Sequence, residues 1–233
     1  MNKQQRYDAE WTGWKAGPLM LSGERRLEQV CGHVRRLRPR RLLDLGCGDG
    51  TFARLVKAAC PGVAIHGCDV SGAALSRTEG LDRAYALDLD GDLLPEADES
   101  FDVVTASEVL EHLSGPRHAL AEAKRVLRPG GRLLVTVPNV AFWRFRWQAL
   151  RGDVPSVTAD ERHLHSYNAA SLRRLLESEG FRVLRITGLR RRFDWLGRVS
   201  CTLLCDSLLA EAERPLTFLL SPYEGERGGA IQR

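Results

Sequence analysis

The sequence lacks the features that mark secreted, disulfide-bonded or membrane-spanning proteins. No stretch reaches the roughly 18 apolar residues needed to cross a bilayer, and the first ten residues are polar, without a secretory signal. The six cysteines form no paired framework, and Cys201 and Cys205 have no second cysteine pair or suitably spaced histidine pair to complete a zinc site. These absences predict a cytoplasmic protein with free thiols and no transmembrane segment.

Neither sign of charge dominates the sequence. It has 34 Lys and Arg against 30 Asp and Glu, for a net charge of +4. Arginines cluster at about 35–41 and 182–198, but no aromatic ladder or nucleic-acid motif interleaves them. We therefore expect solvated faces and no nucleic-acid partner, with an anionic substrate or peripheral contact with a membrane surface as alternatives.

Strand-like and helix-like patterns alternate from about residue 41 onward, which predicts parallel strands joined by crossover helices. The expected strands are 41–45, 63–68, 84–87, 101–106, 132–137 and 181–186, with a last strand near Ala230. The expected helices are 23–38, 51–59, 71–77, 116–127 and a helix capped by Ser171 that ends at Glu179, with apolar helical pieces at 195–210 and 215–220. Hydrophobic residues make up 43% of the chain, enough for a sizeable core.

The first predicted strand ends in a glycine turn, Asp44-Leu45-Gly46-Cys47-Gly48-Asp49-Gly50. Glycines permit positive φ angles and close approach of a ligand, and the helix that follows offers free N–H groups. The order Gly-x-Gly-x-Gly differs from the Gly-x-Gly-x-x-Gly of dinucleotide-binding proteins. The turn therefore predicts a polar, nucleotide-like cofactor and disfavours a nicotinamide dehydrogenase.

Acidic residues follow the second and third predicted strands. Asp69 lies about twenty residues beyond the turn, where a nucleotide-binding sheet places an acid for ribose hydroxyls. Asp88 could reach the edge of an adenine, and Leu89 could pack on the ring. The alternatives are a turn residue or helix cap for Asp69 and a plain loop for Asp88.

Five segments of the chain resemble those of the class I S-adenosylmethionine-dependent methyltransferases, in the same order and spacing. They are Asp44–Gly50, Asp69, Asp88-Leu89, Ser107–Leu113 and Arg128–Leu133. The resemblance covers residues 40–187 and implies a Rossmann-like, seven-stranded, mostly parallel sheet with helices on both faces. It further implies that the cofactor is S-adenosylmethionine, bound by Asp44, Gly46, Cys47, Gly48, Asp69, Val70, Asp88, Leu89, Ser107 and Glu108.

The sulfonium of this cofactor already activates the methyl group, so the protein mainly has to align the reactants and exclude water. A general base is needed only when the acceptor holds its proton. The candidates are His112, just after the fourth strand, and His163 and His165 in the segment 138–168. Structural roles are the alternative for all three. The pair His163 and His165 lacks a third ligand in the sequence, so we expect no metal.

The acceptor is expected to meet Tyr7, Trp143, Arg146 and Tyr167, with core packing as the alternative for the aromatic residues. We divide the chain into an N-terminal helical segment or lid (1–38) and a methyltransferase domain (39–233). The domain carries an insertion at about 138–168 and a C-terminal extension from about 189. The extension could complete the fold, cover the site, form a dimer face or rest on a membrane, so a monomer and a homodimer both remain open.

The sequence as a whole predicts an enzyme that methylates an oxygen, nitrogen or carbon atom of a small molecule. A methyltransferase acting on RNA or protein is one alternative, although no Asn-Pro-Pro-Tyr-type motif is present. A cofactor-binding partner protein without catalytic activity is another.

Overall fold

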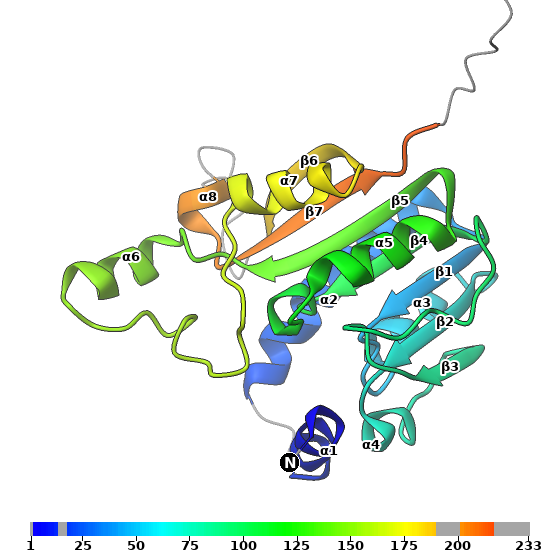
Figure 1. The fold of residues 1–233 in the computed structure, drawn as a ribbon, viewed down its shortest axis with the longest axis horizontal. Coiled ribbons are helices and arrows are strands. Elements are labelled where there is room, and N and C mark those ends of the chain that lie inside the picture. Colours follow the sequence, from blue (N-terminus) through cyan, green and yellow to red (C-terminus); the bar gives the residue numbers. More distant parts are fainter. Residues whose placement is uncertain (1, 14–17, 190–200, 217–233) are drawn as a thin grey trace, which may run out of the picture.

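A seven-stranded sheet forms the centre of the computed structural model, which describes residues 2–13, 18–189 and 201–216 (Figure 1). The strands are β1 (Arg41–Leu45), β2 (Ala64–Asp69), β3 (Arg83–Ala86), β4 (Phe101–Ser107), β5 (Leu127–Pro138), β6 (Arg182–Leu189) and β7 (Ser207–Glu213). Their order is β3-β2-β1-β4-β5-β7-β6. All neighbouring pairs are parallel except those of β7, which runs antiparallel to both β5 and β6. The predicted fold class is confirmed.

Helices cover both faces of this sheet (Figure 1). One face carries α2 (Pro18–Leu37) and α3 (Thr51–Ala59), and the other carries α5 (Pro116–Val126) and α7 (Ala169–Ser178). Because side chains alternate along a strand, neighbouring β1 residues serve different layers. Leu42 packs with α2 and α3, whereas Leu43 packs with α5 and α7. The two buried layers fix the position of the strand ends, where the site lies.

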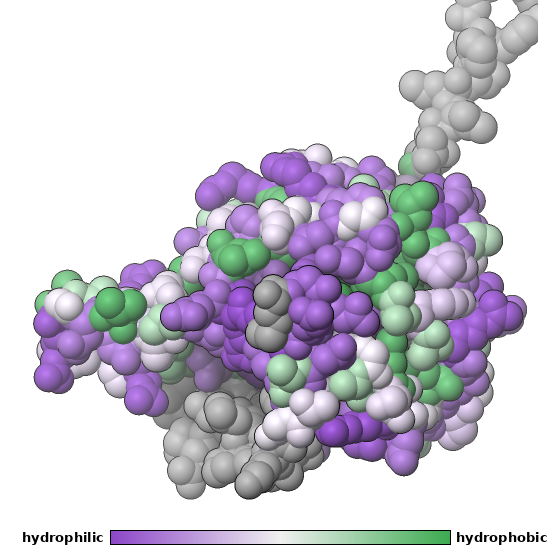
Figure 2. All heavy atoms as spheres, turned by 60° about the horizontal axis from the view of Figure 1, so that its bottom comes forward, coloured by the Kyte–Doolittle hydropathy of each residue, from purple (hydrophilic) through white to green (hydrophobic). Residues whose placement is uncertain are grey.

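The smaller elements are α1 (Lys3–Gly13), α4 (Gly72–Leu75), the 3₁₀ helix η1 (Leu110–His112), α6 (Trp143–Leu150) and α8 (Cys201–Leu204). α1 buries no residue fully and packs against α4. α6 projects away from the body (Figure 1), and the projection carries exposed hydrophobic side chains (Figure 2), among them Trp147 and Leu150. Within the described residues, no helix combines the length and apolar character that crossing a bilayer requires.

Several predicted elements are corrected by the structure. Residues 207–210, expected to end an apolar helical piece, instead belong to β7 (Ser207–Glu213). The strand expected near Ala230 lies outside the described residues, as do 195–200 and 217–220. The residues of β7 are mostly Leu, Ala and Glu, which favour helix. Insertion between β5 and β6 overrides that preference, as tertiary context often does.

Helix boundaries also differ from the prediction. The N-cap of α7 is Asn168, and Ser171 is its partner three residues on in a capping box. Residues 3–13 form a helix that was not predicted, α2 begins at residue 18 instead of 23, and α6 interrupts the segment expected to be irregular. These differences change the surroundings of the site and leave the sheet unchanged.

Candidate functional site

A cavity of about 390 Å³ opens where β1, β2 and β4 end. All ten residues predicted to bind the cofactor line it: Asp44, Gly46, Cys47, Gly48, Asp69, Val70, Asp88, Leu89, Ser107 and Glu108. The other walls come from α1, α2, α3 and η1. Parallel strands bring their carboxyl ends to one edge of the sheet, so residues far apart in the sequence meet there.

Glycine is required at the turn after β1. Gly46 and Gly48 have φ angles of 70° and 53°, which residues with a Cβ rarely adopt. A Cβ on Gly46 would lie 2.5 Å from Val109 Cγ2, and one on Gly48 would lie 2.9 Å from the Trp11 ring. A side chain at either position would therefore strain the turn and crowd Val109 or Trp11.

The two acids nearest the turn are held by hydrogen bonds. Thr105 Oγ1 donates to Asp44 Oδ1 at 2.6 Å, and burial raises the Asp44 pKa to about 7 against the opposing effect of that bond. Asp69 Oδ2 accepts from the Gly48 amide and Oδ1 accepts from the Ser71 amide, both at 2.9 Å. Burial raises the pKa of Asp69 while these amides oppose the shift. Both carboxyl groups are thus fixed in position before any ligand binds.

α1 is tied to the cavity rim by polar contacts. Lys3 forms ion pairs with Asp88 and with Asp90, the second at 2.6 Å. Asp8 accepts hydrogen bonds from Ser71 Oγ at 2.6 Å and from the Ala73 amide at 3.0 Å, at the start of α4. Because four α1 residues line the cavity (Lys3, Tyr7, Glu10 and Trp11), α1 covers it.

The opposite wall begins at the end of β4. Glu108 has a φ angle of 56°, a strained conformation for a residue with a side chain. Its amide donates to Thr136 O at 3.0 Å, and its Oε2 accepts from Arg26 of α2 at 3.1 Å. The turn that follows leads into η1, which presents His112 to the cavity.

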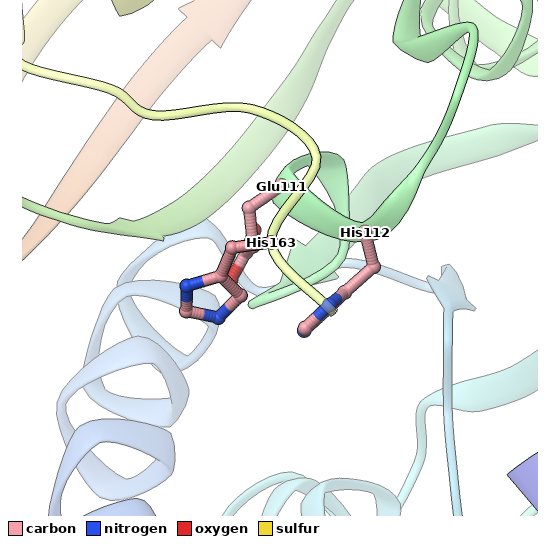
Figure 3. A group of neighbouring side chains, drawn as sticks. All are labelled: Glu111, His112 and His163. Carbon is pink, nitrogen blue, oxygen red and sulfur yellow. The ribbon is translucent and has the colours of Figure 1, made fainter. Parts of the chain in front are cut away.

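Glu111, His112 and His163 come together beside this wall (Figure 3). His112 and His163 were predicted candidates, but Glu111 was missed. Its signal in the sequence is the spacing Glu108-x-x-Glu111-His112, which places both acids near the end of one strand. Thr105, Arg26 and Lys3 were also missed, because their partners lie far away in the sequence.

Of the remaining residues predicted for catalysis or acceptor binding, some line the cavity and others lie away from it. Tyr7 lines the cavity and meets the edge of the His112 ring, with the ring centroids 6.5 Å apart. His165 donates its amide to Glu111 O at 3.1 Å, and Tyr167 is buried in the core; neither lines the cavity. Trp143 and Arg146 lie on α6, exposed and apart from the cavity residues.

Comparisons with known proteins agree with this geometry. A family model described as a methyltransferase domain matches residues 23–186. The chain is 31% identical over 217 residues to malonyl-[acyl-carrier protein] O-methyltransferase of Methylococcus capsulatus, covering 86% of this chain and 74% of that protein. It is 37% identical over 142 residues to 27-O-demethylrifamycin SV methyltransferase of Amycolatopsis mediterranei, covering 54% and 51%. The chain thus spans about half the length of the second relative.

Solved structures share the fold. Magnesium protoporphyrin IX methyltransferase from Synechocystis, solved with bound S-adenosylhomocysteine, superposes with a TM-score of 0.63 at 17% identity, covering 90% of this chain and 93% of that one. A methyltransferase from Archaeoglobus fulgidus gives 0.59 at 19% identity, covering 91% and 100%. With the family match and the lining of the cavity, the conclusion is that the chain belongs to the class I S-adenosylmethionine-dependent methyltransferase family.

Proposed function

We propose that this protein transfers a methyl group from S-adenosylmethionine to an oxygen atom of a small molecule. The observation that carries the proposal is the convergence of the ten predicted cofactor residues on one cavity. When bound, the cofactor supplies a methyl group activated by its sulfonium. The protein's own task is to orient the two reactants and to keep water away.

The residues of the cavity suit the parts of the cofactor. The carboxylate of Asp69 is positioned by two backbone amides and can accept hydrogen bonds from ribose hydroxyls. Val70 and Leu89 offer apolar surface for the adenine, and the bare backbone at Gly46 and Gly48 allows close approach. We assign α1 the role of a lid, because its residues line the cavity and its contacts with the rim are polar.

An oxygen acceptor is supported by the relatives and by the wall near His112. The malonyl-[acyl-carrier protein] relative is named as an O-methyltransferase, as is a 26% identical ubiquinone-biosynthesis relative from Coxiella burnetii. Burial lowers the pKa of His112, so its ring is neutral at pH 7 and can contact a hydroxyl. We place the acceptor beside the Tyr7 and His112 rings.

Calorimetric titration with S-adenosylmethionine, and in parallel with NAD, tests the cofactor. We expect Asp69→Ala to weaken S-adenosylmethionine binding by at least about tenfold, the equivalent of losing one charged hydrogen bond. Asp98→Ala is the matched control, because the Asp98 carboxylate is 71% exposed and lies outside the cavity. Unchanged affinity in Asp69→Ala, or binding of NAD alone, would overturn the assignment.

The acceptor class needs a transfer assay. The protein is incubated with a tritiated methyl donor and separate pools of metabolites, lipids, RNA and proteins. We expect label in a small-molecule fraction, in a product that loses it in treatments that cleave methyl ethers or methyl esters and leave N-methyl groups intact. Label in RNA or protein would replace the proposed acceptor, and label in no fraction would favour a cofactor-binding partner protein.

A further inference from the structure

Three side chains with metal-binding atoms converge from two separate segments of the chain. Glu111 and His112 belong to η1, and His163 belongs to the segment after α6 (Figure 3). One potential ligand atom from each residue lies within 4.8 Å of the other two. The two imidazole rings are tilted by 53°, with their centroids 4.9 Å apart. We propose that these three residues bind a divalent transition-metal ion beside the cavity, which His112 lines.

Backbone carbonyls fix both imidazole rings in the form that binds metals. His112 Nδ1 is 3.0 Å from Arg162 O, and His163 Nδ1 is 2.8 Å from Val157 O. A carbonyl only accepts, so each Nδ1 carries the proton and each Nε2 keeps its lone pair. Asp160 Oδ2 lies 3.9 Å from His163 Nε2, too far for a hydrogen bond. Hydrogen bonds from Nδ1 to a backbone carbonyl, like those of His112 and His163, are a usual way in which proteins orient histidine ligands.

Glu111 provides independent support. Its side chain is 1% exposed, and neither carboxylate oxygen has a hydrogen-bond partner among the described residues. Burying a carboxylate in this way is costly unless a positive charge is close by. The guanidinium of Arg26 donates to Glu108 Oε2 at 3.1 Å instead. A divalent cation would supply both the charge and the missing partner for Glu111.

The ligand set narrows the choice of ion. Two imidazoles and one carboxylate suit zinc and other first-row transition metals, whereas calcium and magnesium prefer oxygen ligands alone. Three protein ligands leave coordination positions for other molecules. His112 lines the cavity, so those positions are on the side where we place the acceptor.

If the protein has the proposed methyltransferase activity, on which this inference rests, the ion indicates the chemical class of the acceptor. A hydroxyl or phenol bound to the ion has a lowered pKa. Its proton leaves to solvent, and the oxygen forms a bond to the methyl carbon. The bond from that carbon to sulfur breaks and its electron pair stays on sulfur, which changes from a cationic sulfonium to a neutral thioether. We infer an acceptor with a free hydroxyl that reaches His112.

Titration of the full chain with metal alone tests the site. After treatment with a chelator, the protein is titrated with zinc by calorimetry and with cobalt by absorption spectroscopy. We expect one equivalent to bind, and Glu111→Gln and His163→Gln each to weaken binding by about 100-fold or more. His118→Gln is the matched control, because His118 of α5 lies outside the cluster, and its affinity should be unchanged.

Three results would overturn the site: no saturable binding, equal affinity in the variants and the wild type, or a cobalt spectrum with thiolate charge-transfer bands, which would place the ion on cysteines. Circular dichroism of each variant confirms that it is folded. Full methyl transfer by chelator-treated protein would refute the role of the ion while leaving the proposed function intact. Metal binding without any methyl transfer would refute the proposed function while leaving the site intact.

Discussion

The two walls of the cavity differ in how their polar groups are satisfied. At the glycine-turn wall, formed by Asp44–Gly50 and Asp69, the buried carboxyl groups are held by Thr105 and by backbone amides. At the His112 wall, where Glu108 and His112 line the cavity and Glu111 and His163 lie beside His112, both Glu111 oxygens and Glu108 Oε1 have no hydrogen-bond partner among the described residues. The first wall satisfies its buried carboxyl groups from within the protein, whereas the second leaves carboxylate oxygens without a partner among the described residues.

The substitution with the largest expected effect on stability lies in the glycine-turn wall. Gly50 has a φ angle of 78°, and a Cβ there would lie 2.5 Å from the backbone oxygen of Glu79. We expect Gly50→Ala to lower the free energy of unfolding by about 3 kcal/mol, measured by urea denaturation. Gly62→Ala, where a Cβ would meet nothing within 4 Å, should change it by less than about 0.5 kcal/mol. Equal effects would show that the turn is not strained.

The next prediction removes a partner from the same wall. Thr105→Val preserves the shape of the side chain and deletes the hydroxyl that donates to buried Asp44. We expect the free energy of unfolding to fall by about 2 kcal/mol, because the carboxyl group loses its partner. A wild-type value in denaturation experiments would mean that Asp44 is satisfied in another way.

The pH dependence of stability should also report on Asp44. Its pKa is raised by burial to about 7, so between about pH 5 and pH 7 the carboxyl is protonated in the folded protein and ionised in the unfolded one. Folding then takes up a proton, so stability falls as pH rises through this range.

Comparing wild type with Asp44→Asn isolates this group. The difference in free energy of unfolding between the two proteins should change by about 1 kcal/mol per pH unit from pH 5 to 7 and level off above pH 7. Parallel curves from pH 5 to 8 would contradict the raised pKa.

At the His112 wall, a substitution should raise the free energy of unfolding, whereas those at the glycine-turn wall lower it. Burial raises the pKa of Glu111 well above its usual range, which costs folding free energy at neutral pH. Glu111→Gln removes that cost, so we expect the chelator-treated protein to become more stable by about 1 kcal/mol. The measurement is urea denaturation beside Thr105→Val. A loss of stability in both variants would abolish the contrast between the walls.

The smallest expected effect concerns α1. Lys3→Met keeps the length of the side chain and removes its ion pairs with Asp88 and Asp90. These contacts are partly exposed, so stability should change by less than about 1 kcal/mol. S-adenosylmethionine binding, by contrast, should weaken severalfold in calorimetry if α1 is a lid. Unchanged affinity would show that α1 does not contribute to cofactor binding and would contradict its role as a lid.

The sequence predicted the residues of the glycine-turn wall and three of the four residues of the His112 wall, but it did not predict that Glu111 and His163 lie together, for a physical reason. The turn, Asp69 and Asp88 each follow a strand within one short segment, so local patterns place them. Glu111 and His163 are 52 positions apart and meet only because residues 163–165 return to η1, where Leu164 and His165 donate amides to Glu111 O. No local pattern contains that contact. α6 places Trp143 and Arg146 apart from the cavity. Their contact with the acceptor stays a prediction.

The contacts of α1 have a consequence for ligand binding. Lys3 binds the acid next to the predicted adenine position, whereas Glu10 at the other end pairs with Arg162, at 3.2 Å, immediately before His163. One short helix therefore spans the positions that we propose for both reactants. Displacing it for one reactant also loosens its contacts on the side of the other, so occupancy of one position should change the affinity at the other.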